Sequence, residues 1–449
     1  MVSAPVSDPV RVGVLSLHDS KESKAICNAV EALGHHPEWL REPNTAVHMH
    51  AGEIRLEPDV DVVANRLLLS STEQPAEHVG IAETIAALRP TLNDPHATAL
   101  ATHKIASAAR LVNAGIPLPD TIFALSGELL NRHREQFGPE AVYKTAIGTH
   151  GGGAWKVDTT ESLSPVVGQR RAFLQELLSV EGRSPRDLRV YVVGGEIVGA
   201  MIRHAAESEW RTNVARGGRV EGCTDTVPAE AAAYALEATA VLGLDYAGVD
   251  LIEGADGWHV LEVNPTAGFR GLYEATETSP APFIAKLAIE RGGGSVDDEL
   301  VVDLAATLDD SVPTCMPATE PERYVDPAVI GFTERVVVTG ARGTRTVVGK
   351  SDTGADRSSI DLQLAADIGA GPIHTVSKVR SGSQKKGRSR PVVDIVLGIG
   401  GTQHTVEASI VDRAHMSYPL LLGRDVLKHY HLDVSRRVDA AKPDRRREE

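Results

Sequence analysis

Two carboxylates and one amide stand close together in a stretch whose residues alternate as in a β-hairpin. Residues 250–271 read DLIEGADGWHVLEVNPTAGFRG and contain Asp250, Glu262 and Asn264. The alternation on both sides of GADG predicts two paired strands joined by a tight turn, so Asp250 and Glu262 can face each other. Oxygen ligands of this kind suit Mg²⁺, or Mn²⁺, held beside substrate phosphates. An ordinary hairpin with solvated acids is the alternative, and the rest of the chain has to decide between the two.

A glycine-rich loop lies about a hundred positions earlier. The segment VYKTAIGTHGGGAWKV places Lys144 at the end of a predicted strand, followed by Gly148, Gly151, Gly152 and Gly153. Glycine lets backbone N–H groups approach a phosphate, and a strand-loop-strand setting predicts a flexible lid. Such a loop in isolation is more often a plain hairpin loop. The ordered series from Lys104 on a predicted helix to the acidic hairpin favours the phosphate interpretation.

The elements that must position these residues follow an alternating strand and helix pattern. A buried-type strand over 11–17 precedes a helix that starts near Ser20 and ends at Gly34. Together with the strand DVDVVANRL and the helix EHVGIAETIAALR, this predicts a small open α/β domain over residues 1–95. A single helix from about Pro95 to AGIPLP then opens a second region of alternating strands and loops, residues 96–290.

The composition changes after residue 290. Residues 291–330 contain RGGGSVDDEL and the proline- and acid-rich TCMPATEPERYVDP, which predict a linker. Short β segments from 331 to 434 predict an all-β domain, and 435–449 form a charged tail. The fold class predicted is therefore α/β, with a separate C-terminal β domain.

Composition excludes several classes of protein. The 449 residues carry 61 acidic and 46 basic side chains, for a net charge of −15, which argues against a dedicated nucleic-acid binder. The three cysteines are far apart in the sequence and odd in number, so no disulfide framework is expected. This cysteine usage predicts a reducing compartment. The N-terminus lacks a signal pattern, and no run of about 18 apolar residues occurs. These features predict a cytoplasmic protein without a membrane partner.

The ordered series of motifs resembles the ATP-grasp superfamily, and most closely its RimK-type alpha-glutamate ligase branch, over roughly residues 1–290. The matching segments are HKIASAARLVNAGIPLP, QELL, DLRVYVVG, RTNVARGG and VDLIEGADGWHVLEVNPTAG. The resemblance implies an ATP-grasp fold and a reaction in which ATP activates a carboxylate for attack by an amine. It implies ATP and Mg²⁺ as cofactors, and amino-acid and carboxylate substrates.

The resemblance also implies roles for individual residues, matched motif by motif. ATP contacts are implied for Lys104, Lys144, Gly151, Gly152, Gly153, Gln175, Glu176, Leu177 and Leu178. The implied metal ligands are Asp250, Glu262 and Asn264, and the implied catalytic residues are Arg203 and Asn213. The arginines implied to bind the substrate are Arg189, Arg211 and Arg216. Arginine suits a carboxylate because its planar fork pairs with both oxygens, although Arg189 and Arg216 could equally form surface ion pairs. One departure concerns Arg270 in NPTAGFRG, near a position that is usually acidic in RimK-type ligases. It puts glutamate, as the amino acid added, in question.

A second pair of motifs lies in the C-terminal region. GKSDTGADRSSI at 349–360 and YPLLLGRDVL at 418–427 resemble the retropepsin-like aspartic peptidase fold and the peptidase-like domain, often labelled an ATP-dependent zinc protease, that accompanies RimK-type ligases. Two carboxylates share a proton in an aspartic peptidase, and this domain supplies only Asp352. A working site would need a second copy of the domain, so a homo-oligomer, dimer or tetramer, is expected. A peptidase fold that only binds is the alternative. The histidines of this region lack HExxH spacing, so zinc gains no support.

The favoured hypothesis is an ATP-dependent carboxylate–amine ligase that adds glutamate or another amino acid to a small molecule or to a peptide. The basic segment SKVRSGSQKKGRSRP at 377–391 suggests an acidic peptide or protein tail as a partner. Three alternatives remain open: a synthetase of a glutathione-like or dipeptide metabolite, a peptidase whose ATP-grasp half is regulatory, and a binding module without turnover. ADP release across a panel of amino acids and acceptors discriminates them.

Overall fold

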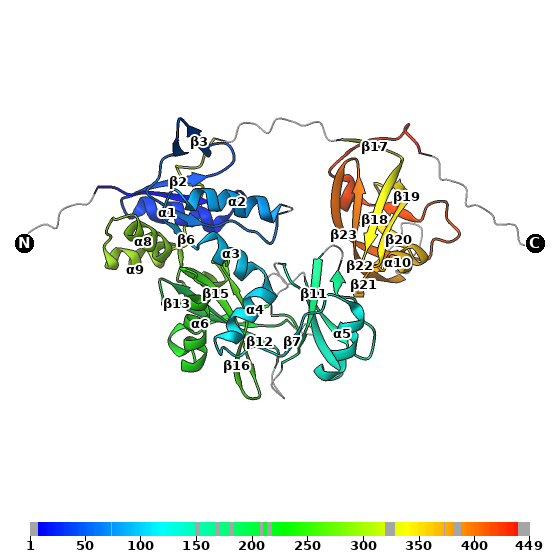
Figure 1. The fold of residues 1–449 in the computed structure, drawn as a ribbon, viewed down its shortest axis with the longest axis horizontal. Helices are drawn as coiled ribbons and strands as arrows, with labels where there is room; N and C mark the ends of the chain where they lie inside the picture. The colour runs from blue at the N-terminus through cyan, green and yellow to red at the C-terminus, as the bar shows by residue number, and fades with distance from the viewer. Residues whose placement is uncertain are drawn as a thin grey trace, which may run out of the picture. The chain divides into compact units, whose positions relative to one another are not determined.

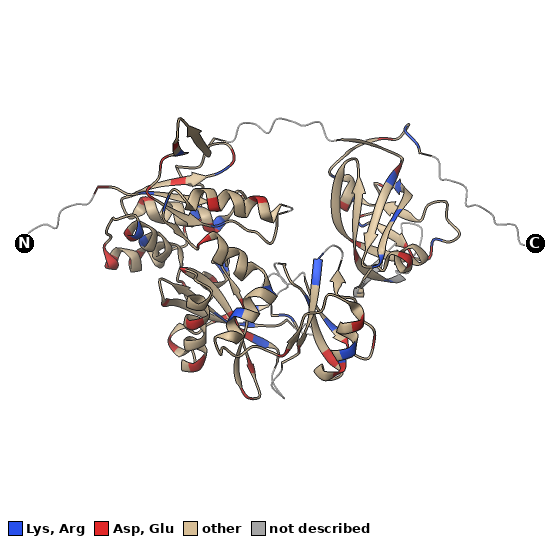
Figure 2. Cartoon of the chain, in the orientation of Figure 1, with Lys and Arg blue, Asp and Glu red and all other residues tan. Residues whose placement is uncertain are grey.

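The computed structural model describes residues 8–72, 74–148, 153–167, 170–178, 184–206, 210–212, 218–318, 328–371, 373–379 and 388–438. Contacts divide the chain into two compact units, coloured by residue number in Figure 1. The first comprises residues 1–120, 147–153 and 177–320, and the second residues 121–146, 154–176 and 321–449. Acidic and basic residues are interspersed along the helices and strands of both units (Figure 2). None of the helices in the described ranges combines the length and hydrophobicity that a bilayer span requires.

The first unit begins with the predicted open α/β arrangement. Its parallel sheet has the order β2-β1-β5-β6, and apolar side chains alternate between two covered faces. Val12 and Val14 face α1 and α8, whereas Leu15 and Val63 face α2. A separate two-stranded ribbon, β3-β4, extends from the sheet. The bounds are β1 Arg11–Leu15, α1 Lys21–Ala32, β2 His36–Leu40, β3 Ala46–His50, β4 Glu53–Glu57, β5 Val62–Asn65, α2 Pro75–Ala86 and β6 Thr91–Leu92.

Helix α1 shows how the sequence sets these boundaries. Ser20 lies before the first turn with extended backbone, and its side chain accepts a hydrogen bond from the Ser23 amide, as an N-cap does. Gly34 follows the helix with a φ of 84°, a conformation that glycine adopts without steric cost. The predicted start near Ser20 and end at Gly34 are confirmed.

The helix predicted from Pro95 is two helices. α3 spans Pro95–Thr102 and α4 spans Lys104–Asn113, with His103 extended between them. The His103 side chain accepts a hydrogen bond from the Ala106 amide, so this residue caps α4. The prediction of a continuous helix was wrong because the apolar spacing does not reveal a side chain that competes for the backbone. The break puts Lys104 at the first position of α4.

A five-stranded antiparallel sheet completes the first unit, in the order β14-β13-β12-β15-β16. One face packs on α6 through Val190, Val192 and Val249, and part of the other face contributes Tyr191 and Val193 to the core beneath α1 and α8. The bounds are β12 Arg186–Val193, β13 Glu196–His204, β14 Arg219–Gly222, α6 Ala229–Val241, β15 Tyr246–Gly254, β16 Gly257–Asn264, α7 Arg270–Thr276, α8 Ala281–Arg291 and α9 Asp298–Ala305.

The segment predicted as a linker, 291–330, is partly structured. It contains helix α9, whose Val301 and Ala305 are buried, and Cys315 and Met316 pack against the core beneath α1. The composition of this segment predicted a linker because it is rich in proline and acidic residues. The short apolar stripe among them packs on the core and forms a helix there. Residues 319–327 lie outside the described part of the chain.

The second unit holds two further β structures, each described by itself. The smaller is the sheet β10-β11-β8-β9, with β7 paired to β11, and it carries the predicted strand before the glycine loop and the first two residues of the QELL segment. The bounds are β7 Thr121–Ile122, α5 Gly127–His133, β8 Glu140–Thr145, β9 Ala154–Asp158, β10 Val166–Val167 and β11 Arg170–Glu176.

The larger is a closed barrel of six strands. Its sheet runs β18-β19-β24-β20-β23-β22, a further pairing of β18 with β22 closes it, and β21 extends beyond β22. Ile360, Ile395 and Leu420 are among its buried residues. The domain was predicted as all-β, and it also has two short helices, α10 and α11. The bounds are β17 Val329–Gly331, β18 Thr333–Gly340, β19 Gly343–Ser351, β20 Ser359–Asp361, α10 Leu362–Ile368, β21 Ile373–Val379, β22 Arg388–Ile399, β23 Thr402–Val411, β24 Leu420–Leu422, α11 Arg424–Leu427 and β25 His431–Asp433.

Asn93 joins the N-terminal sheet to the antiparallel sheet. Its side-chain oxygen accepts from the Asp245 and Tyr246 amides at 2.8 and 3.0 Å, and its amide group donates to the carbonyls of Tyr246 and Pro265 at 2.9 and 3.1 Å. It is fully buried and has a φ of 54°, which asparagine tolerates better than most residues.

We expect Asn93→Ala to lower the free energy of unfolding by about 3 kcal/mol or more, because it leaves several buried backbone groups unpaired. Urea unfolding of the full chain measures the change. Asn113→Ala, at the exposed end of α4, is the matched control and should change stability by less than about 0.5 kcal/mol. Equal stability of the two variants would contradict this role for Asn93.

Candidate active site

The predicted acidic hairpin is present, and its register places the two carboxylates opposite each other. β15 and β16 pair antiparallel with Asp250 beside Glu262, and the turn between Gly254 and Gly257 falls at GADG. Glu262 and Asn264 share one face because strand side chains alternate with a period of two. The Asn264 amide nitrogen lies 3.4 Å from Asp250 Oδ2 and 3.3 Å from Glu262 Oε1. Asp250, Glu262 and Asn264 therefore converge on one point.

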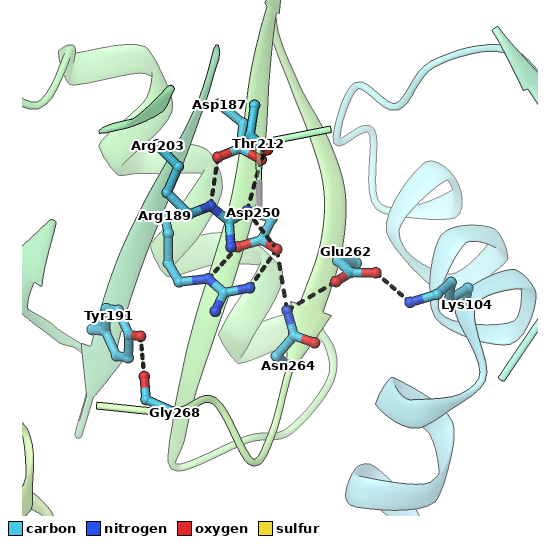
Figure 3. A network of polar contacts seen from close by, with 10 residues as sticks. All are labelled: Lys104, Asp187, Arg189, Tyr191, Arg203, Thr212, Asp250, Glu262, Asn264 and Gly268. Carbon is cyan, nitrogen blue, oxygen red and sulfur yellow. Dashed lines mark hydrogen bonds and ion pairs between the residues drawn. The ribbon is translucent and has the colours of Figure 1, made fainter. Parts of the chain in front are cut away.

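Two arginines from the neighbouring strands close around Asp250 (Figure 3). Arg189 lies directly across from Asp250 in the β12–β15 register, and its Nε and Nη2 donate to the two carboxylate oxygens at 2.5 and 2.6 Å. Arg203 lies across from Asp187 in the β12–β13 register and pairs with it at 2.6 and 2.7 Å. The same guanidinium reaches Asp250 Oδ2 at 3.0 Å. We name these four residues, Asp187, Arg189, Arg203 and Asp250, the charge cluster.

Burial and mutual attraction act against each other in the charge cluster. Burial alone would raise the pKa of Asp250, but Arg189 and Arg203 outweigh it and hold the pKa below its ordinary value. Burial would likewise lower the pKa of Arg189, and Asp250 raises it well above the usual range. Burial and the positive charge of Arg189 both act to lower the pKa of Arg203. Asp250 and Asp187 together outweigh them and raise this pKa above its ordinary value. Asp250, Arg189 and Arg203 are therefore charged near neutral pH.

Lys104 approaches the hairpin from α4. Its ammonium forms an ion pair with Glu262 Oε2, and both side chains are mostly covered. Because Lys104 is the first residue of α4, the break at His103 aims this side chain at the hairpin. The resemblance placed Lys104 on ATP and Glu262 on a metal, and the structure brings the two together.

The donor set fits a hard divalent cation such as Mg²⁺. Asp250, Glu262 and the amide oxygen of Asn264 are oxygen ligands on one face of a hairpin, which is the chemistry that Mg²⁺ uses beside phosphates. A cation at this point would require at least part of the Arg189 or Lys104 contact to be given up. No group of three or more His, Cys, Asp and Glu side chains within the described residues has the spacing to hold a metal, because the hairpin supplies two carboxylates and the amide of Asn264.

The second lysine lies in the other unit. Lys144, near the end of β8, donates to Gln175 Oε1 at 2.6 Å, and the Gln175 amide group donates to the Thr121 hydroxyl at 3.0 Å. Glu176 ends β11, and Leu177 and Leu178 follow it outside the strand.

Several predicted site residues could not be compared with the structure. Gly151, Gly152, Asn213 and Arg216 lie outside the described residues, whereas Gly153 directly precedes β9. Arg211 is described, and its guanidinium stacks on the Trp210 ring with 5.1 Å to the centroid.

Sequence reasoning missed Asp187 and Thr212. Asp187 holds both nitrogens of Arg203 on one side and accepts a hydrogen bond from the Thr212 hydroxyl at 2.5 Å on the other. Its position two residues before Arg189 in DLR was a usable signal, since positions i and i+2 of a strand share a face. What the sequence could not indicate is that β13 would bring Arg203 opposite it.

Comparisons with known proteins agree with this geometry. Residues 101–286 match the model of the RimK-like ATP-grasp domain. The tetrahydromethanopterin:alpha-L-glutamate ligase of Methanocaldococcus jannaschii is 34% identical over 209 residues, which are 45% of this chain and 70% of that ligase. The chain belongs to the RimK-like ATP-grasp ligase family.

Other relatives match different lengths of this chain. A probable alpha-L-glutamate ligase of Alcanivorax borkumensis is 29% identical over 296 residues, or 62% of this chain and 94% of that protein. A solved structure of the ATP-grasp ligase PsnB, complexed with a phosphomimetic variant of minimal precursor, Mg and ADP, superposes with a TM-score of 0.50 at 21% identity, over 63% of this chain and 98% of PsnB, and so shares the fold. At the C-terminus, residues 368–443 match the model described as retropepsin-like aspartic endopeptidase RimB. That match begins after Asp352.

Asp250→Asn tests the charge cluster. The substitution leaves two buried arginines facing a neutral group, so we expect about 3 kcal/mol of lost stability at pH 7, measured by urea unfolding. The folded-state pKa of Asp250 lies below its unfolded value of about 3.9, so its stabilisation is complete above that pH and is lost as the pH falls further. The difference between parent and variant should thus shrink below about pH 4. Asp225→Asn, an exposed acid in the same unit, is the control, and a difference that grows in acid would contradict the assignment.

Proposed function

We propose that the protein is an ATP-dependent carboxylate–amine ligase that forms an amide bond through an acyl phosphate. The observation that carries the proposal is the convergence of three oxygen ligands, two arginines and Lys104 on one face of the β15–β16 hairpin. Glutamate is the first choice for the added amino acid, because relatives from two organisms carry the name alpha-L-glutamate ligase. A peptide or a small molecule is the acceptor class.

The chemistry explains why these residue types are needed. A carboxylate is a poor acyl donor, so one of its oxygens first takes the γ-phosphoryl group of ATP, and ADP leaves. The amine nitrogen then attacks the acyl carbon, and inorganic phosphate leaves with that oxygen. Bound Mg²⁺ would neutralise charge on the phosphoryl oxygens.

The chain's own residues position the reactants and balance their charge. Lys104 lies where it can pair with a phosphoryl oxygen once it releases Glu262. Arg203 is held by Asp187, so its orientation is fixed before substrate binds, and a fixed guanidinium stabilises a developing oxyanion without reorganisation. Arg189 uses its Nε and Nη2 atoms for Asp250, so the Nη1 side of its guanidinium is the part left for a substrate carboxylate.

Arg270 is paired within its own helix. Its side chain is exposed and pairs with Glu274 one turn later in α7 at 3.0 Å. Its positive charge is therefore offset within its own helix. This placement supports glutamate as the first choice despite the reversed charge at that position.

Isotope transfer tests the acyl phosphate. A carboxylate substrate labelled with ¹⁸O on both oxygens should give inorganic phosphate carrying one label, and no label in AMP, because the phosphoryl group attaches to a carboxylate oxygen. ADP release across amino acids and acidic acceptors first identifies the substrate, and mass spectrometry reads the label. Label in AMP would show adenylation and overturn the mechanism.

A pair of variants of the same hairpin gives the control. Glu262→Gln should lower ADP release roughly 100-fold, because it removes the charge of a metal ligand with little change of shape. Glu253→Gln makes the same chemical change near the far end of β15, where Glu253 pairs with Arg186, and should leave the rate within about twofold. Equal rates in the two variants would contradict the metal assignment.

We further propose that the barrel forms an aspartic-peptidase-like site with a second copy of the chain. The barrel brings its two motifs together: β19 and β24 pair in parallel with Ser351 beside Leu422, and the Asp352 amide donates to the Leu422 carbonyl at 2.9 Å. Asp352 Oδ1 accepts from the Gly354 amide at 2.9 Å, and the side chain is partly exposed. One DTGA aspartate per barrel supports a site completed across a twofold axis.

Asp352→Asn separates the two activities. It should abolish hydrolysis of the acidic ligation product and leave ADP release unchanged, because the two sites share no residue. Product analysis by mass spectrometry measures both in the full-length chain. Asp367→Asn, an exposed acid on α10, is the control. Unchanged hydrolysis in Asp352→Asn, or a chain that is strictly monomeric at working concentration, would overturn the shared site.

A further inference from the structure

Three neighbouring parallel strands of the N-terminal sheet end side by side and are followed by polar residues. Leu15 pairs with Leu40 of β2 on one side and with Asn65 of β5 on the other. The residues directly after the strands are Arg41, Ser16 and Arg66, and the Arg66 amide donates to the Leu15 carbonyl at 2.8 Å. The carboxyl ends of parallel strands are where open α/β sheets bind ligands.

Arg66 is a buried cation without an acidic partner. Its residue is 3% exposed, and no carboxylate of the described chain forms an ion pair with it. One nitrogen, Nη2, donates to the Ala267 carbonyl at 3.3 Å, and the guanidinium lies over the Phe269 ring at 5.2 Å. The Nε atom is buried and has no hydrogen-bond partner. Burying a charge without a counter-charge is costly, so this arrangement indicates an anion that the chain itself does not supply.

The surroundings of Arg66 add further donors. His18, two residues after Ser16, is half-buried. Burial and the positive charge of Arg66, with a smaller effect of Arg41, lower its pKa against the opposing charges of Glu22 and Asp19. Arg41 lies over the Trp39 ring at 5.0 Å and also lacks an ion pair within the described chain. Helix α1 begins next, and its N-terminus adds positive potential. The acids of this first turn are engaged locally: Glu22 accepts from Ser20, and Asp19 pairs with Lys24.

This group of residues is continuous with the charge cluster. Ala267 and Phe269 belong to the loop that follows Asn264, and the hydroxyl of Tyr191, two residues after Arg189, donates to the Gly268 carbonyl (Figure 3). A Cβ on Gly248, two residues before Asp250, would lie 2.6 Å from the Ala267 side chain. The loop that Arg66 contacts therefore packs against the strands that carry Arg189 and Asp250.

We propose that Arg66, Arg41 and His18 form an anion subsite that binds a second acidic group, carboxylate or phosphate, of the substrate whose reacting carboxylate lies at the hairpin. This inference rests on the proposed ligase function for the identity of that substrate. Arg66 would pair with the anion from the strand end, and Arg41 and His18 would contact it from the neighbouring ends. The subsite would select acceptors that carry two acidic groups over acceptors that carry one.

Calorimetric titration of the full-length protein with glutarate, and separately with inorganic phosphate, tests the subsite without ATP or metal. We expect saturable binding that weakens roughly tenfold or more in Arg66→Gln and in Arg41→Gln. Arg55→Gln, an exposed arginine of β4 in the same domain, should bind as the parent does. If Arg66→Gln weakens the binding of glutarate more than that of phosphate, the subsite is assigned to a carboxylate. If it weakens the binding of phosphate more, the subsite is assigned to a phosphoryl group.

Two further outcomes separate this inference from the ligase proposal. With an acceptor found by ADP release, Arg66→Gln should raise the KM for the acceptor and leave the KM for ATP unchanged. Anion binding that depends on Arg66, without ADP release from any acceptor, would overturn the ligase and keep the subsite. ADP release with an unchanged acceptor KM in both variants, or anion binding equal to that of the parent, would overturn the subsite and keep the ligase. If Arg66→Gln does not fold, as circular dichroism would show, the half-buried Arg41 carries the test.

Discussion

Four charged side chains in the middle of an antiparallel sheet constrain much of the first unit. Asp250 and Arg203 are both more than nine-tenths buried, and partners on other strands of the sheet compensate their charges. An unpaired charge in this position would cost several kcal/mol, so β13, β12 and β15 are held in one register. The same constraint keeps the arginines fixed before any substrate arrives. For a reaction limited by positioning and charge balance, such a preorganised site is the main requirement.

The remaining contacts of the first unit bring separate pieces of chain to that sheet. The break at His103 turns Lys104 toward Glu262, and Asn93 ties the end of β6 to β15 and to the loop after β16. The loop that follows Asn264 in turn contacts Arg66 of the N-terminal sheet and Tyr191 of β12. The same loop thus contacts both the sheet that carries the charge cluster and the polar end of the parallel strands. This sharing is the structural reason to expect that the N-terminal domain takes part in substrate selection.

The C-terminal barrel is organised differently from the sheets of the first unit. Six strands close on themselves, β21 extends beyond β22, and the Asp352 amide bonds to the Leu422 carbonyl at the end of β24. In the proposed peptidase-like site, Asp352 of one barrel would supply one of the two carboxylates that such a site requires. Assembly of two copies would therefore decide whether the domain hydrolyses or only binds. The ligase half carries no such requirement, because all the members of its charge cluster belong to one chain.

The sequence by itself determined the local features of this protein: the cap at Ser20, the glycine at 34, the hairpin that pairs Asp250 with Glu262, and the two motifs of the barrel. These follow from short-range rules, since caps, turns and a period of two depend on neighbouring residues. The tertiary structure decided what those rules do not reach. Arg203 meets Asp187, and Arg189 meets Asp250, only because β12 lies between β13 and β15, and that strand order is not written in any local pattern. Arg66 likewise became a candidate only through its burial against Phe269, some two hundred residues away, because the cost of a buried charge depends on what surrounds it. The helix within the predicted linker has the same explanation, since its apolar stripe gains stability only from the core that it covers.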